Sequence, residues 1–114
     1  MELLHQNLTD AIIKTFYEVY NELGYGFLER VYQNSLYLEL KNKGFKVEAQ
    51  KKIEVYYKGI EVGQYYADLI VQDLIILELK AADCIVKEFA NQILNYLKGT
   101  NCEVGLLLNF GTKP

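Results

Sequence analysis

The chain has 114 residues, of which 51% are hydrophobic, and a formal net charge of -3; this length suits one compact domain spanning residues 1–114. His5 is the only histidine, and Cys84 and Cys102 form no CxxC pair, so the sequence excludes an internal histidine base and argues against zinc. Since no apolar run reaches membrane-spanning length and residues 1–10 lack a secretory signal pattern, we expect a cytoplasmic protein without a membrane partner. In that reducing compartment we expect both cysteines to be free thiols that are mostly buried.

The first part of the chain predicts two helices. Apolar residues at helical spacing indicate a helix from about residue 8 to residue 23, with Gly24 as its stop. A second apolar stripe indicates a helix over about 28–43, which Gly44 ends. We expect these two helices to form an angled pair.

Strands dominate the second part of the chain. From Val47 the apolar period changes to two, as expected for a strand that buries one face, and Lys58 with Gly59 forms the next turn signal. Continuous Leu and Ile residues in the third strand indicate burial on both faces. The elements expected after the turn are a strand over 60–71, a strand over about 74–80, a helix over about 86–98 and a strand over 104–108.

The order of these elements predicts the fold class. A strand, a crossover helix and another buried strand indicate a parallel pair joined by a right-handed connection. The three earlier strands follow one another as a meander. The predicted class is therefore α/β, with a mixed four-stranded sheet of a three-strand meander plus one parallel strand, flanked by helices in the order α-α-β-β-β-α-β.

Asp68, Glu78 and Lys80 are charged residues inside otherwise apolar strands, where an unpaired buried charge is costly. Glu78 and Lys80 are two residues apart, so their side chains leave the same face of their strand, about 6.5 Å apart along it. Asp68 shares that face only if the connection to the next strand has an odd length. A three-residue loop over 72–74, or a bulge, sets Asp68 opposite Glu78.

Two opposed carboxylates suit an oxygen-preferring cation such as Mg²⁺, or Mn²⁺, that keeps several waters. Such an ion would activate a water and stabilise charge on a scissile phosphate, while Lys80 would orient the nucleophile or offset the developing charge. The alternative is that Asp68, Glu78 and Lys80 form a structural ion-pair cluster at a strand end.

Several segments together resemble one known family. The segment GFLERVY reads Gly-x-x-Glu-x-x-Tyr, with Glu29 and Tyr32, and it occurs with the Asp68 and Glu78-x-Lys80 pattern, with QILNYLKG and with the ending VGLLLNFG. This combination resembles the GxxExxY family of the PD-(D/E)XK nuclease superfamily over nearly the whole chain. The resemblance implies a restriction-endonuclease-like core in which Asp68 and Glu78 bind the metal and Lys80 assists catalysis.

The same resemblance implies further catalytic residues on the helices. Glu29 approaches the site from the second helix, with Tyr32 to orient it or simply to pack, although a first-turn carboxylate also suits the helix dipole alone. The family's supporting positions on the third helix fall on Gln92 and Tyr96, which lie four apart on one helical face and would otherwise only close the core. Phe89 stands where members often have a histidine.

The lysines are unevenly distributed along the chain. Residues 41–58 hold six lysines against Glu48 and Glu54, so this basic strip has a charge of +4 and the remainder -7. A strip of this kind is suited to tracking the phosphates of DNA or RNA; the alternative is a solvated helix end followed by a hairpin. The candidate nucleic-acid contacts are Lys41, Lys43, Lys46, Lys51, Lys52 and Lys58.

The preferred functional interpretation is a Mg²⁺-dependent phosphodiester hydrolase that acts on DNA or RNA. The alternative is a non-catalytic module that binds nucleic acid or a protein partner and keeps the acidic site for structure or regulation. A homodimer is one possible form of this module. The small size, the acidic total charge and the lack of a recognisable specificity domain favour this alternative.

Overall fold

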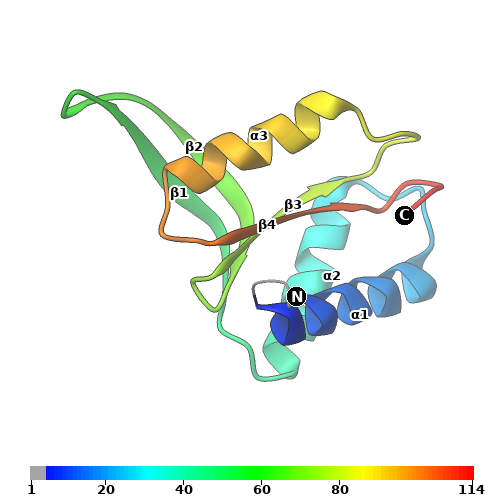
Figure 1. Cartoon of the computed structure of the whole chain (residues 1–114). Coiled ribbons are helices and arrows are strands. Elements are labelled where there is room, and N and C mark those ends of the chain that lie inside the picture. Colours follow the sequence, from blue (N-terminus) through cyan, green and yellow to red (C-terminus); the bar gives the residue numbers. More distant parts are fainter. Residues whose placement is uncertain (1–4) are drawn as a thin grey trace.

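A computed structural model describes residues 5–114, and its elements follow the predicted order (Figure 1). Predicted and observed boundaries differ by no more than two residues, because glycines and the changes in apolar period mark most of them. The elements are α1 (Gln6–Leu23), α2 (Glu29–Asn42), β1 (Val47–Tyr57), β2 (Ile60–Val71), β3 (Ile75–Lys80), α3 (Lys87–Lys98) and β4 (Val104–Asn109).

The four strands form one mixed sheet in the order β1-β2-β3-β4. β1, β2 and β3 are antiparallel neighbours, and β4 is parallel to β3 after the crossover through α3. The predicted α/β class with a meander and one parallel strand is confirmed. β3 has a strand on each side and residues from Ile75 to Leu79 are buried, which explains why its sequence shows no alternation.

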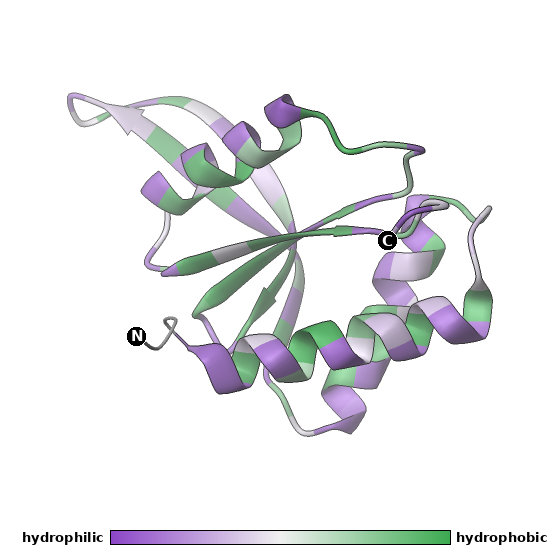
Figure 2. Ribbon diagram, turned by 45° about the vertical axis from the view of Figure 1, so that its right-hand side comes forward, coloured by the Kyte–Doolittle hydropathy of each residue, from purple (hydrophilic) through white to green (hydrophobic). Residues whose placement is uncertain are grey.

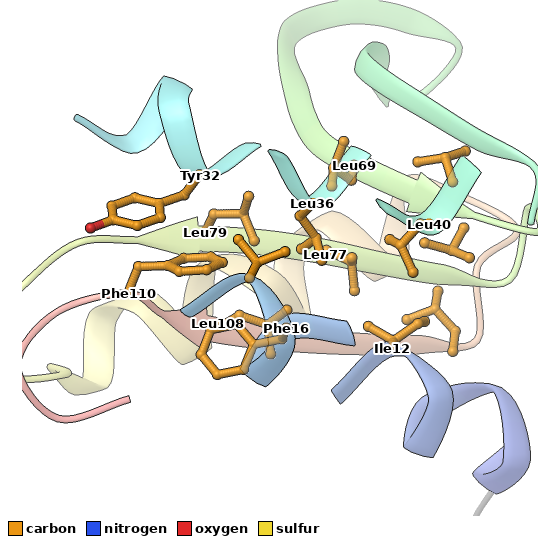
Figure 3. Close-up of a cluster of buried hydrophobic side chains, with 14 residues drawn as sticks. Ile12, Phe16, Tyr32, Leu36, Leu40, Leu69, Leu77, Leu79, Leu108 and Phe110 are labelled. Carbon is orange, nitrogen blue, oxygen red and sulfur yellow. The ribbon is translucent and has the colours of Figure 1, made fainter. Parts of the chain in front are cut away.

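Helices cover the two faces of the sheet unequally. α1 and α2 lie at an angle to each other on one face, and α3 lies on the other (Figure 1). The core under α1 and α2 is wholly apolar where Ile12, Phe16 and Leu36 meet Leu77 and Leu79 (Figure 3). Hydrophobic residues concentrate in the strands at the centre of the molecule, and polar residues in the outer surfaces of the helices (Figure 2).

A smaller cluster lies on the α3 face, where Ile53, Ala67, Ile70 and Ile76 are buried. Close packing of α3 depends on a glycine in β4, because a Cβ at Gly105 would lie 2.1 Å from Cγ2 of Ile93. The far end of the β1–β2 hairpin extends beyond the helices (Figure 1).

Both cysteines are free, as predicted, but the expectation that they are mostly buried is wrong for Cys84. Cys84 is exposed because it lies in the connection between β3 and α3, whereas Cys102 is half-buried beside the α3-face cluster. Within residues 5–114, no helix combines the length and the apolar character needed to cross a membrane.

Candidate metal centre

The connection between β2 and β3 has the odd length that a shared site requires. Residues 72–74 form a three-residue loop, and Leu69 pairs with Leu77. The same register sets Asp68 opposite Glu78, so the prediction of a three-residue connection is confirmed. Two loop residues, Gln72 and Asp73, have left-handed backbone angles, which is how the chain reverses direction over this length.

Asp68 stands where β2 begins to separate from β3. The paired residues of these strands end at Leu69 and Leu77, and the backbone N–H of Leu79 donates a hydrogen bond to Oδ2 of Asp68 at 2.8 Å. A side-chain oxygen therefore replaces a strand carbonyl as the acceptor. This contact holds the Asp68 carboxylate against β3, beside Glu78.

Glu78 is a buried carboxylate whose hydrogen-bonding capacity is not filled. Its residue is 6% exposed, and its Oε1 atom has no hydrogen-bond partner within residues 5–114. Burial first, and then the negative charge of Asp68, raise the pKa of Glu78 to about 8, while the positive charge of Lys80 opposes that shift. An unfilled buried acceptor beside a second carboxylate fits an oxygen-preferring cation.

The number of protein ligands in this centre is small. Across residues 5–114 no group of three or more His, Cys, Asp or Glu side chains has an arrangement that could hold a metal. The candidate centre therefore offers the Asp68 and Glu78 carboxylates alone. Such a pair suits Mg²⁺, which commonly retains several waters and binds through one or two carboxylates.

Lys80 lies on the α3 side of the sheet. Its ammonium nitrogen is 4.7 Å from the centre of the Phe89 ring, in a cation–π arrangement with α3. No ion pair joins Lys80 to Asp68 or Glu78 in the part of the chain that the structure describes. The aromatic ring thus holds the lysine charge close to the carboxylates without using it to neutralise one of them.

Comparison with known proteins places the chain in a family. The sequence model of the PD-(D/E)XK nuclease superfamily matches residues 6–114, which include every helix and strand. The chain belongs to the PD-(D/E)XK nuclease superfamily. A search of curated proteins and a search of solved structures each found no match. Membership of this superfamily supports a nuclease-like fold and a nuclease as the general class of activity.

Tyr32 is buried and fastens a loop. Its hydroxyl donates to the carbonyl of Gly24 at 2.6 Å and accepts from the backbone N–H of Phe27 at 3.2 Å, while its ring stacks on Phe110 at 4.4 Å. Of the two roles predicted for Tyr32, these contacts favour packing.

Glu29 is the first residue of α2 and is exposed, without a hydrogen bond or ion pair to Asp68 among residues 5–114.

The two supporting positions on α3 differ in their surroundings. Gln92 is exposed, and no hydrogen bond joins it to either carboxylate within the described residues. Tyr96 is half-buried, and burial, followed by the charges of Glu78 and Asp68, raises its pKa. The structure therefore brings Tyr96 into the electrostatic range of the carboxylates.

Tyr65 is a neighbour of the site that the sequence did not reveal. Its hydroxyl donates to the carbonyl of Tyr96 at 2.8 Å, and the two rings stack at 3.8 Å. Burial, and then Tyr96 and Glu78, raise the pKa of Tyr65 to about 12. Both tyrosines line a cleft of about 720 Å³ between the hairpin and the end of α3. Among ten tyrosines, no sequence signal distinguishes this one.

Gln33 and Gln50 form a second group that the sequence did not reveal. Nε2 of Gln50 donates to Oε1 of Gln33 at 2.7 Å and lies 3.5 Å from Oδ1 of Asp68. Gln33 is buried on the face of α2 opposite its exposed residues, and a buried amide needs hydrogen-bond partners. Its place in the helical pattern could therefore have indicated that Gln33 forms a hydrogen bond inside the protein.

The basic strip is partly neutralised by carboxylates. Lys43 pairs with Glu18 on α1 at 2.8 Å, which places its ammonium on the helix-pair side of the sheet. Lys46, Lys51 and Lys52 also have carboxylates within 4.0 Å. Lys41 and Lys58 instead lie over tyrosine rings. All six lysines are exposed, but they do not form a uniform positive surface.

Proposed function

We propose that this protein is a Mg²⁺- or Mn²⁺-dependent nuclease of the GxxExxY group that hydrolyses phosphodiester bonds of DNA or RNA in the cytoplasm. The observation that supports this most directly is the buried Oε1 of Glu78, which lacks a hydrogen-bond partner within residues 5–114 and stands beside Asp68. Membership of a nuclease superfamily gives the reaction class.

Asp68 and Glu78 are the proposed ion ligands. Without a cation, burial and the charge of Asp68 favour the protonated form of Glu78. A divalent ion at this position supplies Lewis-acid stabilisation of the charge that develops on a scissile phosphate. The hydrogen bond from Leu79 keeps the Asp68 carboxylate in place, so the chain has an oriented ligand before any ion arrives.

Lys80 is the proposed catalytic cation. It projects from the same face as Glu78, and its contact with Phe89 keeps its charge near the carboxylates but free of an ion pair with them. A lysine so placed can orient the attacking water or offset charge on the phosphate. Glu29 and Gln92 belong to the proposal as exposed residues that approach the substrate from α2 and α3, and Tyr96 as a supporting residue.

The lysine strip is the proposed contact with nucleic acid. Lys51 and Lys52 line a cleft of about 530 Å³ beside the segment that follows α3, and Lys58 lies at the end of the hairpin. Exposed lysines that pair only loosely with carboxylates can exchange those partners for phosphates.

The test is cleavage of a pool of single-stranded and duplex DNA and RNA with Mg²⁺, Mn²⁺ or a chelator. We expect cleavage with either ion, none with the chelator, and none by Glu78→Gln. Glu22→Gln is a matched control, because Glu22 is an exposed carboxylate on α1, away from the proposed contact with nucleic acid. Substrates that shift in a binding assay but are never cut would support the non-catalytic module, and sedimentation would then show whether that module is a homodimer.

A further inference from the structure

One residue of β1 has an unusual backbone. Gln50 has a φ of 52°, in the left-handed region that non-glycine residues seldom adopt. Among residues 5–114, the other non-glycine residues with positive φ lie before α1 or in the two hairpin turns, where such angles are expected: His5, Lys58, Gln72 and Asp73. Gln50 alone in that group lies within a strand. Strain of this kind tends to persist where the surroundings require it.

The register explains what Gln50 faces. Ala49 pairs with Leu69 and Lys51 pairs with Ala67, so Gln50 stands opposite Asp68 between these two pairs. On the other side of β2, Asp68 is opposite Glu78. One row across three neighbouring strands therefore contains Gln50, Asp68 and Glu78.

The side chain of Gln50 connects this row to α2. An amide nitrogen has two N–H groups, and Nε2 of Gln50 directs them to Oε1 of Gln33, at 2.7 Å, and to Oδ1 of Asp68, at 3.5 Å. Gln33 is 8% exposed, so its position is fixed by the packing of α2. The buried amide thereby gives Gln50 a stationary acceptor.

Both oxygens of Asp68 then have a donor. The backbone of Leu79 donates to Oδ2, and Gln50 approaches Oδ1. Two donors on different elements restrict rotation of the carboxylate about its Cβ–Cγ bond. A ligand held in one orientation binds a cation more tightly than one that must be ordered on binding.

We propose that Gln50 is a positioning residue of the metal centre: its left-handed backbone aims its amide at Asp68, and Gln33 holds that amide in place. This inference rests on the proposed function, because it assumes that Asp68 is an ion ligand. The competing explanation is structural, namely that Gln50 serves only to fasten α2 to the sheet.

The test compares Gln50→Ala with Gln50→Gly. Both variants remove the amide, but only glycine also relieves the left-handed strain. We measure the dissociation constant for Mn²⁺ by electron paramagnetic resonance, and thermal melts without metal. We expect about a 10-fold weaker Mn²⁺ affinity in both variants, at the lower end of the range for residues that support a ligand, because the contact with Asp68 is long. Without metal, the glycine variant should melt above the alanine variant.

Two further variants separate the site from the fold. Gln64→Ala removes an exposed glutamine elsewhere on the same hairpin and should leave Mn²⁺ affinity unchanged. Gln33→Met removes the fixed acceptor and should weaken Mn²⁺ binding. Because Gln33 acts through Gln50, the double variant of Gln33→Met with Gln50→Ala should bind Mn²⁺ no more weakly than Gln50→Ala alone.

The possible outcomes are distinct. Wild-type affinity for Mn²⁺ in both Gln50 variants, whatever their melting temperatures, overturns the positioning role and leaves the proposed function standing. A glycine variant that melts below the alanine variant overturns the role of backbone strain. A wild-type protein that does not bind Mn²⁺ overturns the proposed function and this inference together.

Discussion

Alternate residues of β3 face opposite sides of the sheet, and the two sides differ in chemistry. Leu77 and Leu79 pack under α1 and α2 in a cluster of buried hydrophobic side chains. Glu78 and Lys80 face α3, where one buried oxygen has no hydrogen-bond partner within residues 5–114. Burial on the first side stabilises the fold, whereas burial on the second side opposes it unless a cation is present. One six-residue strand thus serves stability and the proposed chemistry on separate faces.

The largest expected effect is on the chemistry of the α3 face. Lys80→Met keeps most of the side-chain stem and removes the charge, so we expect cleavage to fall by about 10² to 10⁴, the usual contribution of a positioned catalytic group. Single-turnover cleavage rates measure it. Mn²⁺ affinity should change little. Lys14→Met, on the exposed surface of α1, is the control, and full cleavage activity in Lys80→Met would remove Lys80 from the mechanism.

On the face of the sheet under α1 and α2, a substitution should lower stability and leave metal binding unchanged. Leu77 is fully buried among α1 and α2 side chains, so Leu77→Ala should lower the free energy of unfolding by about 2 to 5 kcal/mol through lost burial and the cavity left behind. Urea denaturation measures this change. The folded fraction of the variant should keep wild-type Mn²⁺ affinity. A large loss of affinity would mean that the two faces are not independent.

A third prediction tests whether Glu78 is a ligand or part of an ion-pair cluster. Glu78→Gln should remove most of the stabilisation by Mg²⁺ or Mn²⁺, which for a ligand at a hundredfold excess over its dissociation constant is about 2.7 kcal/mol. Without metal, and above the pKa of about 8, the variant should be more stable than wild type, because it no longer opposes Asp68. Thermal melts with and without the ion measure both effects.

The ion-pair alternative predicts the reverse outcome for Glu78→Gln. Removing one partner of a structural cluster would lower stability in the absence of metal, and the ion would make little difference to either protein. If the ion does not stabilise the wild type, and the variant is less stable than the wild type without metal, the metal centre is excluded.

The sequence predicted the β2–β3 half of the site but not the β1 half, for a physical reason. The loop over 72–74 could be predicted because placing Asp68 on the face of Glu78 allows only an odd connection. The turn at Lys58 and Gly59 pairs Tyr57 with Ile60, and a regular hairpin from there would set Gln50 opposite Ala67. A register shift between Val55 and Tyr56 moves Gln50 opposite Asp68 instead. No residue pattern in this strand marks that shift.

Most of the other features that the sequence did not predict are the contacts of long side chains. Helix and strand boundaries follow the local sequence pattern, and the predicted boundaries agreed with the structure. The partner of Lys43 is Glu18, on a helix distant in the sequence, so the local charge of the strip overstated its positive surface. Tyr32 similarly bonds to the backbone of Gly24 and Phe27, a loop contact that helical spacing does not encode. Contacts of this kind depend on tertiary packing.

Measured per pH unit, the smallest expected effect is the pH dependence of stability without metal, because the change is spread over several pH units. The pKa of Glu78 rises from 4.5 to about 8 on folding, so between these values the folded protein binds more protons at this residue than the unfolded chain does. The free energy of unfolding should therefore fall as pH rises through this range, and level off above it.

Glu78→Gln isolates this contribution, since glutamine does not titrate while other carboxylates remain. We expect the variant to lose less stability than wild type between about pH 5 and pH 8, as measured by urea denaturation at each pH. Saturating Mg²⁺ should also reduce the decline in wild type, because a cation favours the ionised carboxylate and its affinity rises with pH. Leu77→Ala should retain the full decline, because it lowers stability on the other face of the sheet and leaves Glu78 in place. Parallel pH profiles for wild type and Glu78→Gln would show that Glu78 ionises normally, and would remove the electrostatic contrast between the two faces of β3.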